Sequence, residues 1–165
     1  MKFNEFYSLT IVHSRDIILV KGVDYMNITK QKSQKTFDKQ AADYDTNIQG
    51  EHARKLYKPI IENLKNKNIH SILDLGCGTG ALLKEIKELN IAEQLFGIDI
   101  SPNMLEIAKN KLGNDATLIL GDSERLPFED SSFDAIVCND SFHHYPQPDI
   151  VEKEVSRCLK QNGVF

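Results

Sequence analysis

Three glycines at alternate positions form a candidate ligand loop. They lie in the segment Asp74-Leu75-Gly76-Cys77-Gly78-Thr79-Gly80, directly after a short apolar run. Glycine at such a turn permits positive φ angles, and the absence of a Cβ lets a ligand approach the backbone closely. Free N–H groups at the start of a following helix favour a negatively charged or electron-rich group of that ligand. The segment therefore predicts a ligand site at a strand-to-helix turn.

Three acidic residues follow three successive apolar runs and narrow the chemistry of that ligand. Asp74 lies two residues before the first glycine, where a carboxylate repels a pyrophosphate and suits a ligand with an amino group. Asp99 lies 19 residues after Gly80, close to the spacing of about 20 at which a carboxylate binds ribose hydroxyls. Asp122 offers acceptor oxygens to an exocyclic amine such as that of adenine. Turn capping is the alternative role for Asp99 and Asp122.

A dinucleotide site is the competing interpretation of the glycines. Dinucleotide enzymes place G-x-G-x-x-G at this turn. Here the third glycine, Gly80, comes one position early, and Ala81 occupies the dinucleotide position. A nicotinamide-dependent oxidoreductase would also need Asp74 beside a pyrophosphate, so we favour a ligand with a ribose and no pyrophosphate.

A fourth apolar run leads into Asn139-Asp140-Ser141-Phe142-His143-His144-Tyr145-Pro146, which carries candidate acid–base groups. Either His143 or His144 is suited to deprotonate a substrate hydroxyl, because histidine titrates near neutral pH. Asp140 is a comparable candidate. Capping or packing of the following loop is the alternative role for one of the histidines.

Short apolar runs alternate with amphipathic stretches from Ile69 onward, which is typical of parallel strands joined by crossover helices. The expected order is β-α-β-α-β-β-α-β, an α/β fold. One helix after Gly80 and one after Ser101 are expected, with buried faces formed by Leu82, Leu83, Ile86 and Leu89, and by Met104, Leu105, Ala108 and Leu112. A third helix is expected from Pro148 to Leu159, and the strands are expected at Ser71–Leu75, Gln94–Ile100, Ala116–Leu120, Phe133–Cys138 and from Val164 onward.

The N-terminal part is expected to precede this domain. Thr36–Leu64 is predicted as a helical lead-in that places Phe37, Ala41 and Tyr44 on one face. Residues 1–35 are predicted to be an N-terminal extension and residues 36–165 the ligand-binding domain, and Met26 is an alternative natural start. The lysines of the lead-in, Lys30, Lys32, Lys35 and Lys39, are expected to form a solvated face.

Composition restricts the classes of function. The 165 residues, of which 41% are hydrophobic, predict one globular domain, and a net charge of −4 argues against sequence-independent nucleic-acid binding. The longest aliphatic run, Ile17–Val20, is too short to span a bilayer. Cys77, Cys138 and Cys158 form no C-x-x-C pair, so we expect no metal site, no disulfide framework and a reducing cytoplasmic compartment.

Five segments in order resemble those of class I S-adenosylmethionine-dependent methyltransferases, most closely the small-molecule branch of ubiquinone/menaquinone-type enzymes. They read L-D-L-G-C-G-T-G, G-I-D-I-S-P-N-M-L, G-D-S-E-R-L-P-F, F-D-A-I-V-C-N and L-K-Q-N-G. The resemblance spans Thr36 to Phe165 and implies a Rossmann-like, doubly wound and mostly parallel sheet. It also implies S-adenosylmethionine as the cofactor and a small-molecule acceptor. The family's last two strands would follow Phe165, so we expect the domain to be incomplete at its C-terminus.

The same resemblance assigns cofactor roles to residues at the ends of the first four strands. It does not imply a catalytic triad, because methyl transfer from a sulfonium mainly needs alignment of the reacting atoms. A non-catalytic fragment that binds the cofactor weakly or not at all is the alternative. The implied contacts are Asp74 and the backbone of Gly76, Cys77, Gly78 and Gly80 to the methionine part, Tyr44 closing over it, Asp99 to the ribose, Ile100 and Met104 flanking the adenine, Asp122 and Ser123 to the adenine amine, and Asn139 beside the cofactor.

Overall fold

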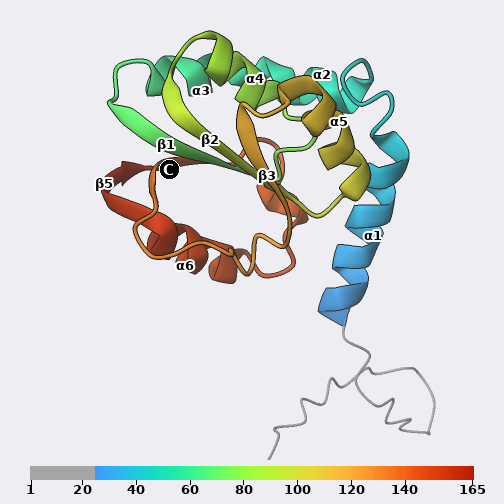
Figure 1. The fold of residues 1–165 in the computed structure, drawn as a ribbon. Coiled ribbons are helices and arrows are strands. Elements are labelled where there is room, and N and C mark those ends of the chain that lie inside the picture. The colour runs from blue at the N-terminus through green and yellow to red at the C-terminus, as the bar shows by residue number, and fades with distance from the viewer. Residues whose placement is uncertain (1–24) are drawn as a thin grey trace, which may run out of the picture.

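The computed structural model describes residues 25–165, with side chains described from Ile28 onward. Most of the predicted N-terminal extension therefore lies outside the described residues. Within them, five strands form one parallel sheet in the order β3-β2-β1-β4-β5 (Figure 1). The strands are β1 (Ile69–Leu75), β2 (Ala92–Asp99), β3 (Ala116–Leu120), β4 (Phe133–Val137) and β5 (Leu159–Val164).

Helices cover both faces of the sheet, as in a doubly wound fold (Figure 1). One layer contains α3 (Tyr57–Leu64), α4 (Ala81–Glu88) and α5 (Pro102–Leu112), and α6 (Pro148–Cys158) packs on the opposite face. The element order confirms the predicted β-α-β-α-β-β-α-β sequence and the α/β, Rossmann-like fold. Because β2 and β4 both pair with β1, the strand order reverses at β1, where open α/β sheets bind ligands.

Two apolar cores flank the central strand. Leu83 and Ile86 of α4 are fully buried on one face, and Val151 of α6 is fully buried on the other. Burying a side chain of this size stabilises the fold by about 1.5–3 kcal/mol. Alternate residues of β1 point to opposite faces, and all but His70 are buried, so the strand is covered on both sides.

Two local predictions are wrong. Leu89 is 47% exposed because α4 ends at Glu88 and the chain turns away at Asn90, whose φ is +50°. The last strand begins at Leu159, directly after α6, and not at Val164. Leu159 pairs with Phe133, and a register irregularity at Phe133/Ala135 accommodates the turn-like Asn162-Gly163 inside the strand.

The helical lead-in does not begin at Thr36. It consists of three helices, the first of which begins at Tyr25. These are α1 (Tyr25–Gln40), α2 (Ile48–Lys55) and α3, so the expected boundary at residue 35 falls inside α1. Pro59 lies in the first turn of α3, where its missing N–H leaves no intrahelical bond unmade. None of the helices in residues 25–165 has the length and apolar character needed to cross a membrane.

Candidate functional site

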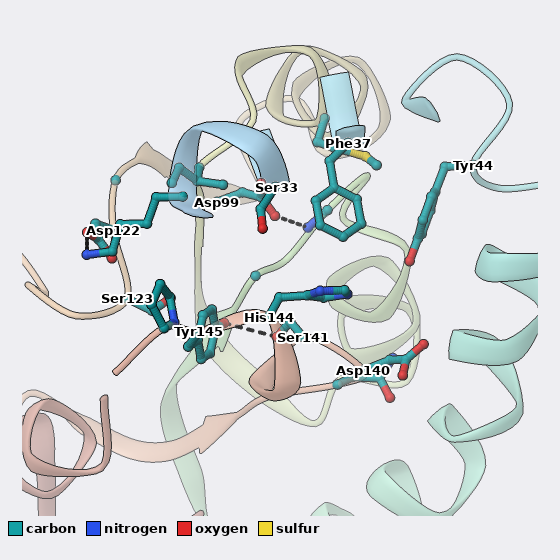
Figure 2. Close-up of a pocket in the computed structure, with 18 residues that line it drawn as sticks. Ser33, Phe37, Tyr44, Asp99, Asp122, Ser123, Asp140, Ser141, His144 and Tyr145 are labelled. Carbon is teal, nitrogen blue, oxygen red and sulfur yellow. Dashed lines mark hydrogen bonds and ion pairs between the residues drawn. The ribbon is translucent and has the colours of Figure 1, made fainter. Parts of the chain in front are cut away.

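The carboxyl ends of β1 to β4 meet at one edge of the sheet and enclose a cavity, the main cavity, roofed by α1 (Figure 2). A second cavity lies beside it and is lined by Tyr44 and by the glycine loop. Of the predicted site residues, Gly80 and His143 line neither cavity. Those that line the main cavity are Tyr44, Gly76, Gly78, Asp99, Ile100, Met104, Asp122, Ser123, Asn139, Asp140 and His144, and those that line the second are Tyr44, Asp74, Gly76, Cys77, Gly78 and Asn139.

Two buried oxygens beside the second cavity have no hydrogen-bond partner among the described residues. They are Oδ1 of Asp74 and Oδ1 of Asn139. Burial, and then the charge of Asp99, raise the pKa of Asp74 from 3.8 to about 8. Unpaired buried acceptors are costly and rare in folded proteins. The second cavity is therefore suited to a ligand group that donates hydrogen bonds, above all a cationic amine.

The first two glycines of the loop have different steric roles. Gly76 has a φ of +68°, and a Cβ there would lie 2.7 Å from both Cβ and Oγ of Ser141. Gly78 has a φ of +52°, and a Cβ there would meet no atom within 4 Å. Gly76 thus permits close packing of the loop on the segment after β4, whereas Gly78 presents bare backbone to open space. This confirms the predicted turn geometry and leaves room for a ligand at Gly78.

Asp99 is buried at the end of β2 and is fixed by the backbone. Its Oδ2 accepts a hydrogen bond from Gly78 N at 2.8 Å, and its Oδ1 accepts one from Ser101 N at 2.8 Å. Burial raises the pKa of Asp99, and these backbone donors oppose the shift. Each carboxylate oxygen retains a further acceptor lone pair. Asp99 therefore caps a turn and also lines the main cavity, so both predicted roles are compatible.

Asp122 follows β3 and is held on two sides. Its Oδ1 accepts a hydrogen bond from Glu124 N at 2.9 Å, and its Oδ2 lies 2.6 Å from Nζ of Lys30. Lys30 also contacts Oε2 of Glu124 at 2.5 Å, and its side chain is only 21% exposed. The prediction that Lys30 belongs to a solvated lysine face is thus wrong, since the carboxylates after β3 bind it. Lys32, Lys35 and Lys39 are exposed as predicted.

Tyr44 lies between the two cavities, just beyond the end of α1. The next residue, Asp45, accepts a hydrogen bond from Oγ1 of Thr79 at 2.5 Å and pairs with Lys111 at 2.7 Å. These contacts attach the segment after α1 to the glycine loop. Burial raises the pKa of Tyr44, so its hydroxyl stays protonated near neutral pH.

The part of the main cavity between α1 and the segment after β4 is lined by aromatic and titratable side chains (Figure 2). The rings of His144 and Phe37 meet edge to face, with centroids 5.1 Å apart. Burial, and then the neighbouring His143, lower the pKa of His144, so its imidazole is neutral and able to accept a proton at pH 7. Asp140 adopts a φ of +54°, and its Oδ2 lies 3.1 Å from Nδ1 of His52 on α2.

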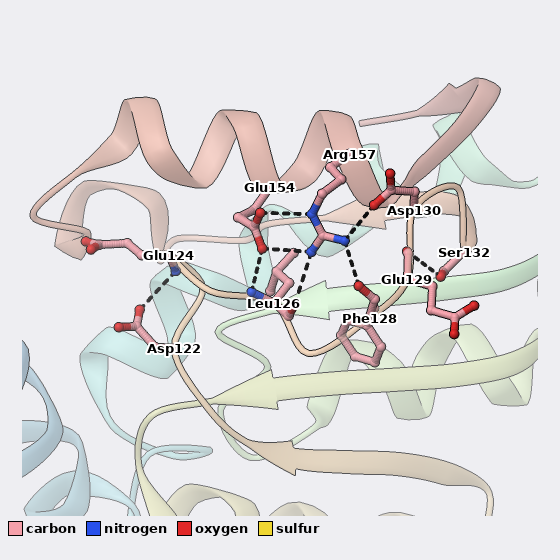
Figure 3. Close-up of polar contacts among 9 residues, drawn as sticks. All are labelled: Asp122, Glu124, Leu126, Phe128, Glu129, Asp130, Ser132, Glu154 and Arg157. Carbon is pink, nitrogen blue, oxygen red and sulfur yellow. Dashed lines mark hydrogen bonds and ion pairs between the residues drawn. The ribbon is translucent and has the colours of Figure 1, made fainter. Parts of the chain in front are cut away.

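The loop between β3 and β4 is held in place by α6 (Figure 3). Arg157 donates hydrogen bonds to the carbonyl oxygens of Phe128, at 2.7 Å, and Leu126, at 3.1 Å. Glu154 accepts a hydrogen bond from Leu126 N at 2.8 Å and pairs with Arg157. This network anchors the middle of the loop that carries Asp122.

Sequence reasoning missed Lys30, His52, Glu124 and Arg157, whose partners lie far along the chain. One local signal was present: Lys30, Ser33 and Phe37 have the i, i+3, i+7 spacing of one helix face, and all three line the main cavity.

Known proteins similar to this chain include methyltransferases and proteins that contain a methyltransferase domain. The family described as "Methyltransferase domain" matches residues 73–165. The demethylmenaquinone methyltransferase of Thermotoga maritima is 34% identical over 138 residues, covering 82% of this chain and 60% of that protein. The malonyl-[acyl-carrier protein] O-methyltransferase of Legionella pneumophila is 34% identical over 135 residues, covering 78% of this chain and 46% of that protein. The solved YcgJ protein of Bacillus subtilis superposes with a TM-score of 0.62 at 28% identity, covering 67% of this chain and 48% of that one. The chain thus spans roughly half the length of the proteins it matches.

Proposed function

The chain belongs to the methyltransferase domain family, and on this premise we propose that it transfers a methyl group from S-adenosylmethionine to a small organic acceptor. The observation that carries the proposal is the pair of unpartnered oxygens of Asp74 and Asn139 beside the second cavity. The methionine part of the cofactor carries an ammonium group, which supplies the donors that these acceptors lack. A nicotinamide dinucleotide would instead bring a pyrophosphate toward Asp74, which burial and repulsion disfavour.

The remaining cofactor contacts follow the ends of the strands. In the proposal, Asp99 accepts hydrogen bonds from the two ribose hydroxyls, using the acceptor capacity that its backbone donors leave free. Ile100 and Met104 flank the adenine, and Asp122 with Ser123 meets its amino edge. Asp74, Tyr44, Asn139 and the glycine loop hold the methionine end, with Gly78 facing the ligand and Gly76, Cys77 and Gly80 shaping the turn.

S-adenosylmethionine supplies an activated methyl group on a sulfonium. The contribution of the protein is to align the acceptor with that group and to exclude water, and alignment alone can lower a barrier by about 7–11 kcal/mol at best. Phe37, Tyr44 and His144 form an aromatic wall suited to this purpose.

We assign proton removal from the acceptor to His144. Its imidazole faces the main cavity and is neutral near pH 7, as a general base must be. Asp140, oriented by His52, is the second candidate on the same side. His143 packs against His144 with ring centroids 4.0 Å apart and lies outside the cavity lining, so we give it no direct role.

We propose an acceptor with an ionisable hydroxyl or acidic C–H group on an apolar frame. The aromatic wall and the neutral imidazole favour such a molecule. The similarity to a demethylmenaquinone methyltransferase suggests a quinol as the first acceptor to test. The proposal places the protein in a reducing cytoplasm, where free thiols such as Cys77 and Cys158 are typical.

Transfer of labelled methyl groups tests the proposal. The chain is incubated with methyl-labelled S-adenosylmethionine and either a reduced demethylated quinone or a malonyl thioester, and the label is followed into organic extracts. Label in one acceptor, reduced at least tenfold in His144→Asn, supports methyl transfer with His144 as base. Cofactor binding without transfer to either acceptor would favour the non-catalytic alternative.

A further inference from the structure

Glu124 is a buried carboxylate beside the main cavity that the proposed chemistry does not use. Its side chain is 5% exposed. It accepts hydrogen bonds from Gln147 N at 3.0 Å and Gln147 Nε2 at 2.9 Å, and it pairs with Lys30 at 2.5 Å. A buried carboxylate is tolerated when both its charge and its hydrogen bonds are satisfied. Glu124 therefore joins α1 to the segment before α6.

The ammonium of Lys30 also reaches the residue proposed to bind adenine. Nζ lies 2.6 Å from Oδ2 of Asp122, whose other oxygen accepts a hydrogen bond from Glu124 N. Burial acts to lower the pKa of Lys30, but the hydrogen bonds to the two carboxylates outweigh it and raise the pKa. Lys30 is thus charged across the physiological pH range and fixes the rotamer of Asp122.

Helix α1 covers the main cavity, and Lys30 is the lining residue nearest its N-terminus. Ser33 and Phe37 lie on the same helix face and line the cavity with it. Near the C-terminal end of α1, Asp38 accepts a hydrogen bond from Oγ of Ser101 at 2.6 Å, and its carbonyl oxygen accepts one from Asn103 Nδ2 at 3.0 Å. The helix is therefore tied to the sheet domain on two sides of the cavity, at Asp38 and at Lys30.

We propose that Lys30 is a positioning residue for the cofactor: its ion pairs with Asp122 and Glu124 latch α1 across the main cavity and set how long the adenosyl cofactor stays bound. This inference rests on the proposed function. When the N-terminal half of α1 moves away from the main cavity, both ion pairs of Lys30 must break. The negative charge of Glu124 must then be solvated or remain without a counter-charge. The latch therefore slows release of the ligand.

Release kinetics test the latch. S-adenosylhomocysteine bound to the full chain is displaced by excess unlabelled ligand in a stopped-flow or filter assay. We expect Lys30→Met, which keeps the length of the side chain and removes its charge, to accelerate release by about tenfold. Lys30→Arg should stay within about threefold of the wild type, and Lys32→Met, on the exposed side of the same helix, should leave the rate unchanged. Equal release rates in the wild type and Lys30→Met would overturn the proposal.

Hydrogen exchange of the ligand-free chain provides a readout that does not depend on the cofactor. Lys30→Met should accelerate amide exchange in α1 while the exchange rates of β1 and α4 remain unchanged, because the substitution loosens only α1. A general loss of protection over all elements would instead mean that Lys30 merely stabilises the fold. If the wild type fails to bind S-adenosylhomocysteine, the proposed function fails, but the exchange rates of α1 still test the latch.

The double variant Lys30→Met/Glu124→Gln distinguishes two effects of Lys30→Met: the loss of the ion pairs that hold α1, and the burial of an unpaired carboxylate at Glu124. Glu124→Gln removes the carboxylate that Lys30→Met leaves unpaired, so thermal stability should recover toward that of the wild type. The latch proposal predicts that ligand release and exchange of α1 stay fast in the double variant. Recovery of slow release together with stability would show that the single variant acted through the bare charge and would overturn the latch.

Discussion

Asp74→Asn is expected to stabilise the ligand-free chain progressively as the pH rises. Burial raises the pKa of Asp74 from 3.8 to about 8 in the folded state. A carboxyl group with a raised folded pKa contributes its full stability below the unfolded pKa, and that contribution is lost as the pH rises through the folded value. Each unit of pKa difference corresponds to about 1.4 kcal/mol. Between pH 5 and pH 8, Asp74 alone should therefore cost the wild type about 3–4 kcal/mol of unfolding free energy, whereas an amide at this position does not titrate.

Urea unfolding followed by circular dichroism at pH 5 and pH 8 measures this difference. Relative to the wild type, Asp74→Asn should gain about 3–4 kcal/mol more at pH 8 than at pH 5. Asp134→Asn is the matched control, because hydrogen bonds from Lys160 and Ser71 overcome desolvation and lower the pKa of Asp134 to about 2. The contribution of Asp134 is complete above pH 3.8, so the difference between this variant and the wild type should be the same at both pH values. Parallel pH profiles for the wild type and Asp74→Asn would refute the assignment of Asp74 as an uncompensated buried acid.

Further predictions concern the glycine loop, the hydrogen bonds of Arg157 on α6, and His144. Gly76→Ala should destabilise the fold by about 2–3 kcal/mol in urea unfolding, because its Cβ would lie 2.7 Å from Ser141 at a φ of +68°. Gly78→Ala should cost only about 1 kcal/mol of unfolding free energy, yet weaken S-adenosylhomocysteine binding at least tenfold in calorimetry; equal stability losses in the two variants would contradict the packing argument. Arg157→Met should cost about 2 kcal/mol and accelerate amide exchange in the β3–β4 loop, and an unchanged exchange rate there would exclude the anchoring role. Methyl transfer should rise with pH to a plateau through an apparent pKa below 6.5, and His144→Asn should abolish that acidic limb.

Local patterns allowed the sheet and the carboxylates that line its cavities to be predicted. Each crossover in a parallel sheet returns the chain to the same edge, so residues that directly follow successive strands converge. Asp99 and Asp122 line the main cavity and Asp74 lines the second for that reason. Helix limits were predictable where a cap marks them, as at Ser101, whose Oγ accepts the hydrogen bond from Met104 N.

The contacts that close the site were not predictable from sequence, because they join segments far apart in the chain. In the sequence, nothing distinguishes Lys30 from the exposed lysines that follow it. Its carboxylate partners lie 92 and 94 residues away and meet it only when α1 packs on the sheet domain. Arg157 binds carbonyl oxygens, and backbone acceptors leave no trace in the residue pattern. The start of the last strand is hidden in the sequence because Asn162-Gly163 is typical of a turn, whereas a register irregularity lets β5 include these two residues.

Calorimetric titration of the full chain with S-adenosylhomocysteine tests the central claim most directly, with NADH titrated in parallel and Asp99→Asn as the matched variant. The account predicts saturable binding of S-adenosylhomocysteine, at least tenfold weaker binding by Asp99→Asn, and no binding of NADH. It also predicts tighter binding at pH 8 than at pH 6, because the ligand ammonium pairs with an ionised Asp74. A folded chain that binds NADH, or binds S-adenosylhomocysteine with no dependence on Asp99 or on pH, would contradict it.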